Sequence, residues 1–109
     1  MVTIDQFRRG LAAYADREII DRLPYGTLKR VLAGSAVAIA MQRGLDNMLR
    51  NPAVQALGIV SGDEIDADLL RETFAAQIPP EGVTVDLLGM ALTFNPDDVQ
   101  AIYRCVMEG

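Results

Sequence analysis

The chain has 109 residues, of which 50% are apolar and 23% charged, so residues 1–109 have the size of a single domain with its own core. Its 15 acidic and 10 basic side chains give a net charge of −5, which leaves no overall basic excess for holding a polyanion. There is no His and one Cys, Cys105, which excludes histidine acid-base chemistry, histidine metal sites and an internal disulfide.

The first predicted helix begins after Thr3, because Thr3 and Gln6 match the capping-box pattern. Apolar residues then recur at steps of three and four over residues 4–23. Gly10 stands inside this helix, where glycine is expected to cost about 1 kcal/mol relative to alanine. The segment 23–26, which contains a proline and a glycine, ends the helix and turns the chain.

A second helix is predicted over residues 27–50, with a length of roughly 35 Å at 1.5 Å per residue. Pro52 ends it, because proline lacks a backbone N–H and disfavours helix at the residue before it. A short helical segment follows at residues 52–57. The most apolar stretch, residues 31–41, is 11 residues long. A membrane-spanning helix needs roughly 20, so we interpret this stretch as a buried helix and expect no membrane association.

The acidic segment 63–68 resembles the end of a calcium-binding loop. In that register, however, glycine and valine stand where oxygen ligands are required, so no metal site is expected there. Asp66 is expected instead to cap a third helix, whose apolar line is Leu70, Phe74 and Ile78.

Two alternating runs, residues 83–87 and 90–94, predict a β-hairpin with its turn at residues 88–89. Pairing Val85 with Leu92 places the apolar side chains of both runs on one face. An isolated hairpin is only marginally stable, so this face is expected to pack on helices, and residues 59–60 are a candidate third short strand.

The last helix is predicted to begin with Asn95 as its cap, Pro96 at its first position, and Asp97 and Asp98 where the helix dipole favours negative charge. The succession of elements predicts a helix-dominated α+β fold. It consists of four helices, a short fifth one and one C-terminal β-hairpin.

Candidate catalytic groups lack the partners that catalysis needs. Cys105 and the serines have no histidine to act as a base, and no glycine spacing matches a phosphate loop or a dinucleotide fingerprint. The helix dipole already accounts for Asp97 and Asp98. We therefore expect a protein that is not an enzyme and that holds no cofactor and no metal.

Closely spaced small residues mark the long second helix. Small residues let another backbone approach the helix closely. That backbone belongs either to the same chain, in which case this helix is the central helix of the core, or to a second subunit. A small chain has few elements with which to cover every face of so long a helix. We therefore hypothesise a self-association face on this helix, formed by Gly34, Ala38, Met41 and Leu45.

Charge is divided unevenly along the chain. Residues 1–50 carry eight basic and five acidic side chains, a net of +3, while residues 51–109 carry two basic and ten acidic ones, a net of −8. The two halves are expected to attract each other, either within one fold or between subunits in head-to-tail contact. A contact with nucleic acid would rest on Arg8, Arg9 and the pair at 29–30, without interleaved aromatic residues.

Four segments of the chain, in order, resemble small uncharacterised proteins encoded in phages and prophages of Gram-positive gut bacteria. They are residues 51–60 (NPAVQALGIV), 65–70 (IDADLL), 82–94 (GVTVDLLGMALTF) and 97–103 (DDVQAIY). The resemblance implies a phage context, with the structural and assembly proteins of the particle as a natural class.

These observations predict a non-enzymatic protein that acts by self-association or by binding a partner protein. The expected state is a homo-oligomer, located in the cytoplasm or incorporated in a phage particle. The alternative is a small regulatory binding module that contacts nucleic acid through the basic N-terminal half.

Overall fold

The computed structural model describes residues 1–22, 26–87 and 90–108, and its elements follow the predicted order. The described residues form the mostly helical α+β fold that the sequence predicts. The helices are α1 (Ile4–Tyr14), α2 (Thr27–Leu49), α3 (Pro52–Ala56), α4 (Ala67–Gln77) and α5 (Pro96–Glu108). The strands are β1 (Val2–Thr3), β2 (Val60–Ser61), β3 (Glu64–Ile65), β4 (Val83–Leu87) and β5 (Met90–Phe94).

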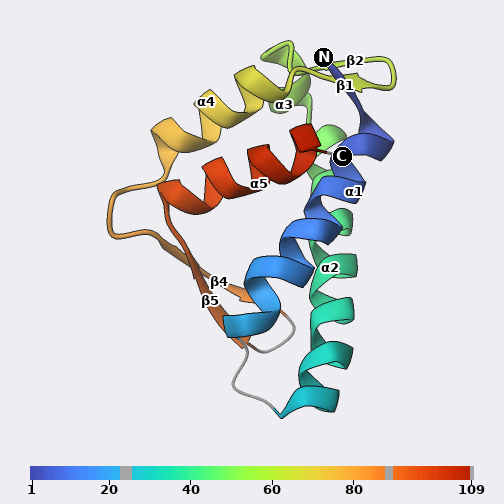
Figure 1. The fold of residues 1–109 in the computed structure, drawn as a ribbon. Helices are drawn as coiled ribbons and strands as arrows, with labels where there is room; N and C mark the ends of the chain where they lie inside the picture. Colours follow the sequence, from blue (N-terminus) through green and yellow to red (C-terminus); the bar gives the residue numbers. More distant parts are fainter. Residues whose placement is uncertain (23–25, 88–89, 109) are drawn as a thin grey trace.

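Helix α1 is the centre of the arrangement (Figure 1). It packs against α2 on one side and against α5 on the other, and α4 lies alongside α5. The β4–β5 hairpin connects the outer end of α4 with the start of α5 and extends toward the helical segment that follows α1. Helix α4 and strand β5 of the hairpin therefore both contact α5.

The N-terminal cap of α1 confirms half of the predicted capping box. The hydroxyl of Thr3 accepts a hydrogen bond from the backbone N–H of Gln6 at 3.0 Å. The side chain of Gln6 does not return to Thr3. It donates instead to the backbone oxygen of Val106 at 3.0 Å, because α5 passes directly beside this turn. The cap residue thereby ties the first helix to the last.

The helix predicted to continue beyond α1 does so with a change of geometry. Residues Ala15–Ile19 (η1) form a π-helix, and Ile20–Arg22 (η2) form a 3₁₀-helix. A π-helical turn widens the helix and re-aims its side chains, and here Tyr14, Ala15 and Ile19 are all fully buried. The predicted turn at residues 23–26 lies, except for Gly26, outside the described residues.

The other predicted helix ends are confirmed by their caps. Helix α2 stops at Leu49, and the side chain of Asn51 caps α3 by accepting from the N–H of Ala53 at 2.9 Å. Asp66 caps α4 by accepting from the N–H of Leu69 at 3.1 Å. These caps are local patterns, which is why the sequence alone predicts them.

Residues 59–60 do not join the hairpin as a third strand. Val60 does lie in a strand, but it pairs with Ile65 of β3 in a separate sheet of order β1-β3-β2. The hairpin β4–β5 is a sheet of its own among the described residues. The reason is local: Gly62, at φ +61°, forms a tight turn that folds β2 directly back onto β3, and Val2 then pairs with β3 from its other side.

The predicted register of the hairpin is confirmed. Val83 pairs with Phe94 and Val85 with Leu92, while the opposite face, which carries Thr84, is exposed. Burial of the apolar face is graded, since Leu92 is 6% exposed and Val83 is 40% exposed. The predicted turn at residues 88–89 lies outside the described residues. The hairpin thus rests on the helices near Leu92 and stands away from them toward Val83.

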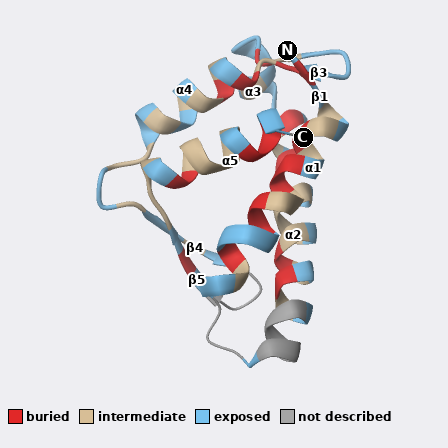
Figure 2. Ribbon diagram, in the orientation of Figure 1, coloured by how far each residue is buried: buried red, intermediate tan, exposed pale blue. Residues whose placement is uncertain are grey.

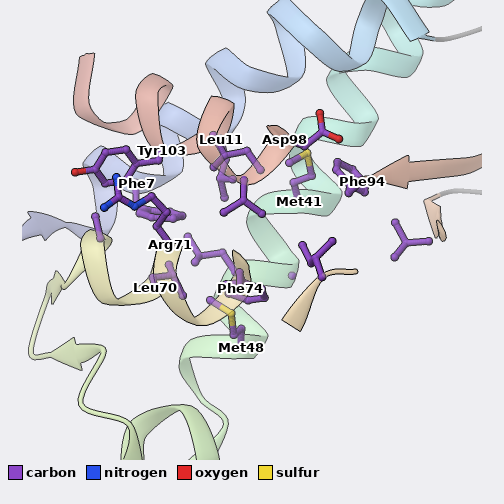
Figure 3. Close-up of a pocket in the computed structure, with 17 residues that line it drawn as sticks. Phe7, Leu11, Met41, Met48, Leu70, Arg71, Phe74, Phe94, Asp98 and Tyr103 are labelled. Atoms are coloured by element: carbon purple, nitrogen blue, oxygen red, sulfur yellow. The ribbon is translucent and has the colours of Figure 1, made fainter. Parts of the chain in front are cut away.

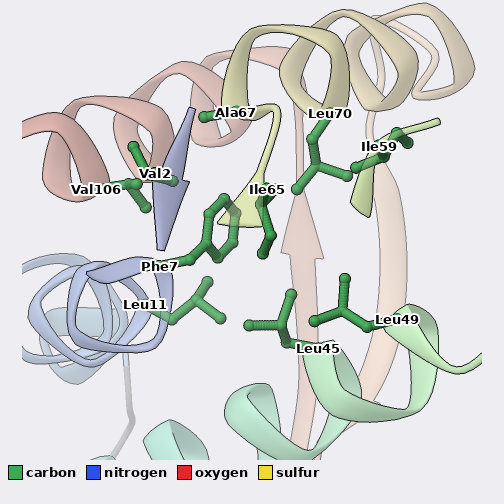
Figure 4. Packing of buried hydrophobic residues seen from close by; sticks show 10 residues of the cluster. All are labelled: Val2, Phe7, Leu11, Leu45, Leu49, Ile59, Ile65, Ala67, Leu70 and Val106. Carbon is green, nitrogen blue, oxygen red and sulfur yellow. The ribbon is translucent and has the colours of Figure 1, made fainter. Parts of the chain in front are cut away.

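Buried apolar residues form two clusters along α1 (Figure 2). The first lies where the small sheet, α2, α4 and α5 meet the start of α1 (Figure 4): Val2, Phe7, Leu11, Leu45, Leu49, Ile59, Ile65, Ala67, Leu70 and Val106. The second joins the end of α1 and η1 to α2, α5 and the hairpin: Tyr14, Ala15, Ile19, Val37, Leu92 and Cys105.

Candidate functional site

An apolar pocket of about 420 Å³ lies among α1, α2, α4, α5 and the hairpin (Figure 3). Seventeen residues line it, and all but Arg71, Asp98 and Tyr103 have side chains without polar atoms. The pocket is open to solvent near Phe74, whose exposed fraction is 37%. A mostly apolar concavity of this size, with a few fixed polar groups, is the usual form of a binding site.

Helix α4 supplies one wall of this pocket through the apolar line predicted from its spacing. Leu70, Phe74 and Ile78 all line the pocket, as do Met41 and Met48 of α2 on another wall. The sequence predicts that this line faces inward, and Leu70 is buried accordingly. Helix α4 packs mainly on α5, and the space between α4 and α2 is left unfilled.

The polar groups at the α4–α5 side of the pocket already have partners. The guanidinium of Arg71 lies 4.2 Å from the centre of the Tyr103 ring, a cation–π contact. The hydroxyl of Tyr103 donates to Asp68 at 2.5 Å, and this hydrogen bond raises the pKa of the phenol. This edge of the pocket is therefore a fixed wall, formed by residues of α4 and α5.

Asp98, at another edge of the pocket, is the most heavily engaged polar group of the described chain. It is 5% exposed and accepts at one carboxylate oxygen from the Tyr14 hydroxyl at 3.0 Å and from Arg22 at 2.5 Å. Its other oxygen accepts from the N–H of Asn95, whose side chain in turn accepts from the N–H of Asp98. Asn95 and Asp98 thus form a reciprocal cap of α5, and Asp98 also anchors the end of the first helical run.

The sequence pattern predicts the same role for Asp97 and Asp98 in the first turn of α5, whereas the structure separates them. Asp97 is exposed, whereas Asp98 is buried among partners that come from more than 70 residues earlier in the chain. No local pattern marks Tyr14 and Arg22 as partners of Asp98. Only the packing of η1 and η2 against α5 brings them together.

Hydrogen bonding sets the protonation of this group. Burial alone would raise the pKa of Asp98, but hydrogen bonds from Arg22, the Asn95 backbone and Tyr14 outweigh it and hold that pKa below its ordinary value. Burial, followed by the charge of Asp98, raises the pKa of the Tyr14 phenol. Asp98 is therefore a carboxylate, and Tyr14 a neutral donor, throughout the neutral pH range.

A pH dependence of stability follows from the lowered pKa of Asp98. As the pH falls below about 4, the ordinary aspartate range, the unfolded chain takes up a proton at this position before the folded chain does. The free energy of unfolding then decreases until the pH has passed below the folded pKa. Urea unfolding between about pH 5 and 2 should show a shallower loss for Asp98→Asn than for wild type, and equal slopes would contradict this assignment.

The hypothesised self-association face lies against the protein's own core. A Cβ on Gly34 would lie 3.1 Å from the side chain of Ile20, so the groove beside Gly34 is filled by η2 of the same chain. Ala38 packs against the second cluster, and Leu45 is 5% exposed in the first. Met41 lines the pocket. In the described structure this set therefore faces the protein's own core and the pocket, because the small residues admit an internal neighbour. Self-association through α2 stays a prediction.

The remaining sequence candidates have structural roles. Cys105 is 8% exposed, and its Sγ lies 3.9 Å from a guanidinium nitrogen of Arg17. In the acidic turn, the backbone oxygen of Asp63 accepts from the N–H of Ile4 at 2.8 Å, which attaches the turn to α1. Within residues 1–22, 26–87 and 90–108, no three acidic or cysteine side chains form a group that could hold a metal ion.

Part of the charge asymmetry is used inside the fold. Arg17 pairs with Glu108 at 2.8 Å and Arg22 pairs with Asp98, so two basic residues of the first half bind acidic residues of α5. Arg8 pairs with an acid of its own half, Asp46. The side chains at positions 29–30 of the N-terminal basic set lie outside those that the structure describes.

In the described part of the chain, no helix has the combination of length and apolarity needed to cross a membrane. Comparisons with protein families, with curated proteins and with solved structures find no match.

Proposed function

We propose that this protein is a non-enzymatic interaction protein that self-associates, and that the apolar pocket receives the partner. The observation that carries the proposal is the pocket itself, about 420 Å³ of apolar-lined space in a chain of 109 residues. The phage context implied by the sequence resemblance makes it a structural or assembly factor, located in the cytoplasm or in a particle.

The energetics of the pocket favour an occupant. The pocket opens to solvent, so water contacts its apolar walls. Apolar surface in contact with water is less favourable than buried apolar surface by about 25 cal/mol per Å². Apolar side chains from a partner would fill the same space and release that water.

The chemistry of the lining favours binding over catalysis. Met41 and Met48 give two flexible, polarisable surfaces that adapt to different apolar side chains. The three polar side chains of the lining, Arg71, Asp98 and Tyr103, are held by neighbours of the same chain. These features support a receptor for apolar side chains.

Filling the pocket from within tests the proposal. Gly44 lines the pocket, and a Cβ there would meet nothing within 4 Å. Gly44→Leu should therefore fold, since leucine is also a better helix former than glycine by roughly 0.8 kcal/mol. Sedimentation equilibrium at high micromolar concentration should show wild type above its monomer mass of 11.9 kDa and Gly44→Leu at that mass.

Gly44→Ala is the matched control, because it makes the same gain in helix propensity without filling the pocket. It should associate as wild type does. A wild-type protein that stays at 11.9 kDa overturns the proposed self-association, and a Gly44→Leu protein that associates as tightly as wild type shows that the pocket is not used.

A further inference from the structure

The guanidinium of Arg71 lines the pocket with its hydrogen-bond donors unused. Its flat face stacks on the ring of Tyr103, and its nearest carboxylate oxygen, on Asp68, is 3.7 Å away. Stacking uses the face of a guanidinium, whereas the five N–H groups point outward in its plane. Among the described residues, no acceptor takes a hydrogen bond from them. The cation is therefore held in place by its own chain while its donors remain available to a ligand.

The other two polar side chains of the lining are already used. The hydroxyl of Tyr103 donates to Asp68, and Asp98 is 5% exposed and pairs with Arg22. The negative charge at that edge of the pocket is thus neutralised within the fold. Arg71 is the charged lining group without a hydrogen-bonded counter-ion in the described structure, so an anion is the charge that the pocket accepts.

This cation lies near the opening of the pocket. The Arg71 side chain is 30% exposed, and Phe74, one helical turn further along α4, is the exposed residue at the opening. Figure 3 shows Arg71 and Tyr103 at one end of the pocket and Phe94 at the other. A molecule bound here would meet a positive charge beside the opening and apolar walls beyond it.

We infer that the pocket binds a single-chain amphiphile with a carboxylate at one end. A guanidinium binds a carboxylate through two parallel hydrogen bonds, and the apolar chain enters the pocket beside it. A cavity of roughly 150 Å³ holds the six carbons of benzene, so about 420 Å³ holds a chain on the order of 10–16 carbon atoms. The flexible side chains of Met41 and Met48 adapt to such a chain.

This inference goes beyond the proposed function, because it does not depend on self-association. It also predicts a chemical selectivity that a merely apolar pocket would lack. A neutral chain leaves the donors of Arg71 to water, and a chain with a cationic end is repelled by the guanidinium. The carboxylate form alone uses both the walls and the charge.

Isothermal titration calorimetry with two probes of equal chain length tests the inference. The probes are decanoate and 1-decanol, at about pH 8, where a carboxylic acid is ionised, and below the concentration at which decanoate forms micelles. Arg71→Met removes the charge and keeps an apolar stem. It should weaken decanoate binding about tenfold, the loss of a charged hydrogen bond at a partly exposed site, and leave decanol binding unchanged.

Arg104→Met is the matched control, because Arg104 is an exposed arginine of α5 outside the pocket lining and its loss changes the net charge equally. It should bind decanoate as wild type does. Gly44→Leu, which fills the pocket, should weaken both probes by more than tenfold.

Three results would overturn the inference. They are no binding of decanoate to wild type, an equal loss of decanoate binding in Arg71→Met and Arg104→Met, and an equal loss of decanol and decanoate binding in Arg71→Met. The last would mean that Arg71 only shapes the wall. Sedimentation of the protein without decanoate tests the proposed self-association separately, so a monomer there would leave this inference intact.

Discussion

Gly10→Ala should destabilise the protein by about 3 kcal/mol, at the upper end of the range for overpacked sites. A Cβ at position 10 would lie 2.5 Å from the Cα of Val106 and 2.8 Å from its backbone nitrogen. Because the obstacle is backbone, no side-chain rotation relieves it, and α1 must move away from α5. Urea unfolding of the variant should show a lowered midpoint, and the hydrogen bond from Gln6 to Val106 should weaken with it.

The matched control for this variant is Gly44→Ala, in which a helical glycine with open space around it is replaced. Helix propensity alone predicts a gain of up to about 1 kcal/mol for both substitutions. The structure predicts opposite signs, a loss at position 10 and a gain at position 44. Similar gains at both positions would show that α1 and α5 do not approach as closely as described.

Asp98→Ala should cost about 2–4 kcal/mol, from about 1–3 kcal/mol for leaving the buried Tyr14 hydroxyl without its acceptor and about 1 kcal/mol for the lost cap of α5. The substitution leaves the Tyr14 hydroxyl without its acceptor and Arg22 without its carboxylate, and it removes half of the α5 cap. Both losses act where the end of the first helical run meets α5. Thermal or urea unfolding measures the effect directly.

Asp97→Ala separates this network from the general effect of an acid at a helix start. Asp97 is exposed in the same turn of α5, so its replacement should cost only about 0.3–1 kcal/mol, the usual contribution of the helix dipole. If Asp98→Ala costs no more than Asp97→Ala, the bonds to Tyr14 and Arg22 contribute nothing and the description of Asp98 is wrong.

Local patterns carried most of the helix and hairpin prediction. Asn51 before a proline, Asp66 before an apolar periodicity, and the alternation around Val85 and Leu92 each depend on residues a few positions apart. Caps and hairpin registers are satisfied by near neighbours in the chain. Such features are therefore readable without knowledge of the tertiary structure.

The features that a local pattern could not predict depend on distant partners. The strand partner of Val60, the π-helical turn after Tyr14 and the acceptors of Arg22 are all set by packing between segments far apart in sequence. The pocket is of the same kind. Its α4 wall was predicted as an apolar line, but the space in front of that wall exists only because the hairpin and α2 stand away from it.

The small residues of α1 and α2 also show what the sequence alone does not predict. Gly10 and Gly34 both admit a close neighbour, Val106 and Ile20 respectively, and in each case the neighbour belongs to the same chain. A sequence shows that a close approach is allowed, but not which segment makes it.

Alkylation of an engineered thiol tests most directly whether the pocket receives a second molecule. In a Cys105→Ala background, Phe74→Cys marks the pocket, and Leu57→Cys marks an exposed control position outside it. The account predicts that the rate of alkylation at position 74 falls as the protein concentration rises through self-association, because the partner covers the pocket, while the rate at position 57 stays constant. An unchanged rate at position 74 in a protein that associates would contradict a partner in the pocket.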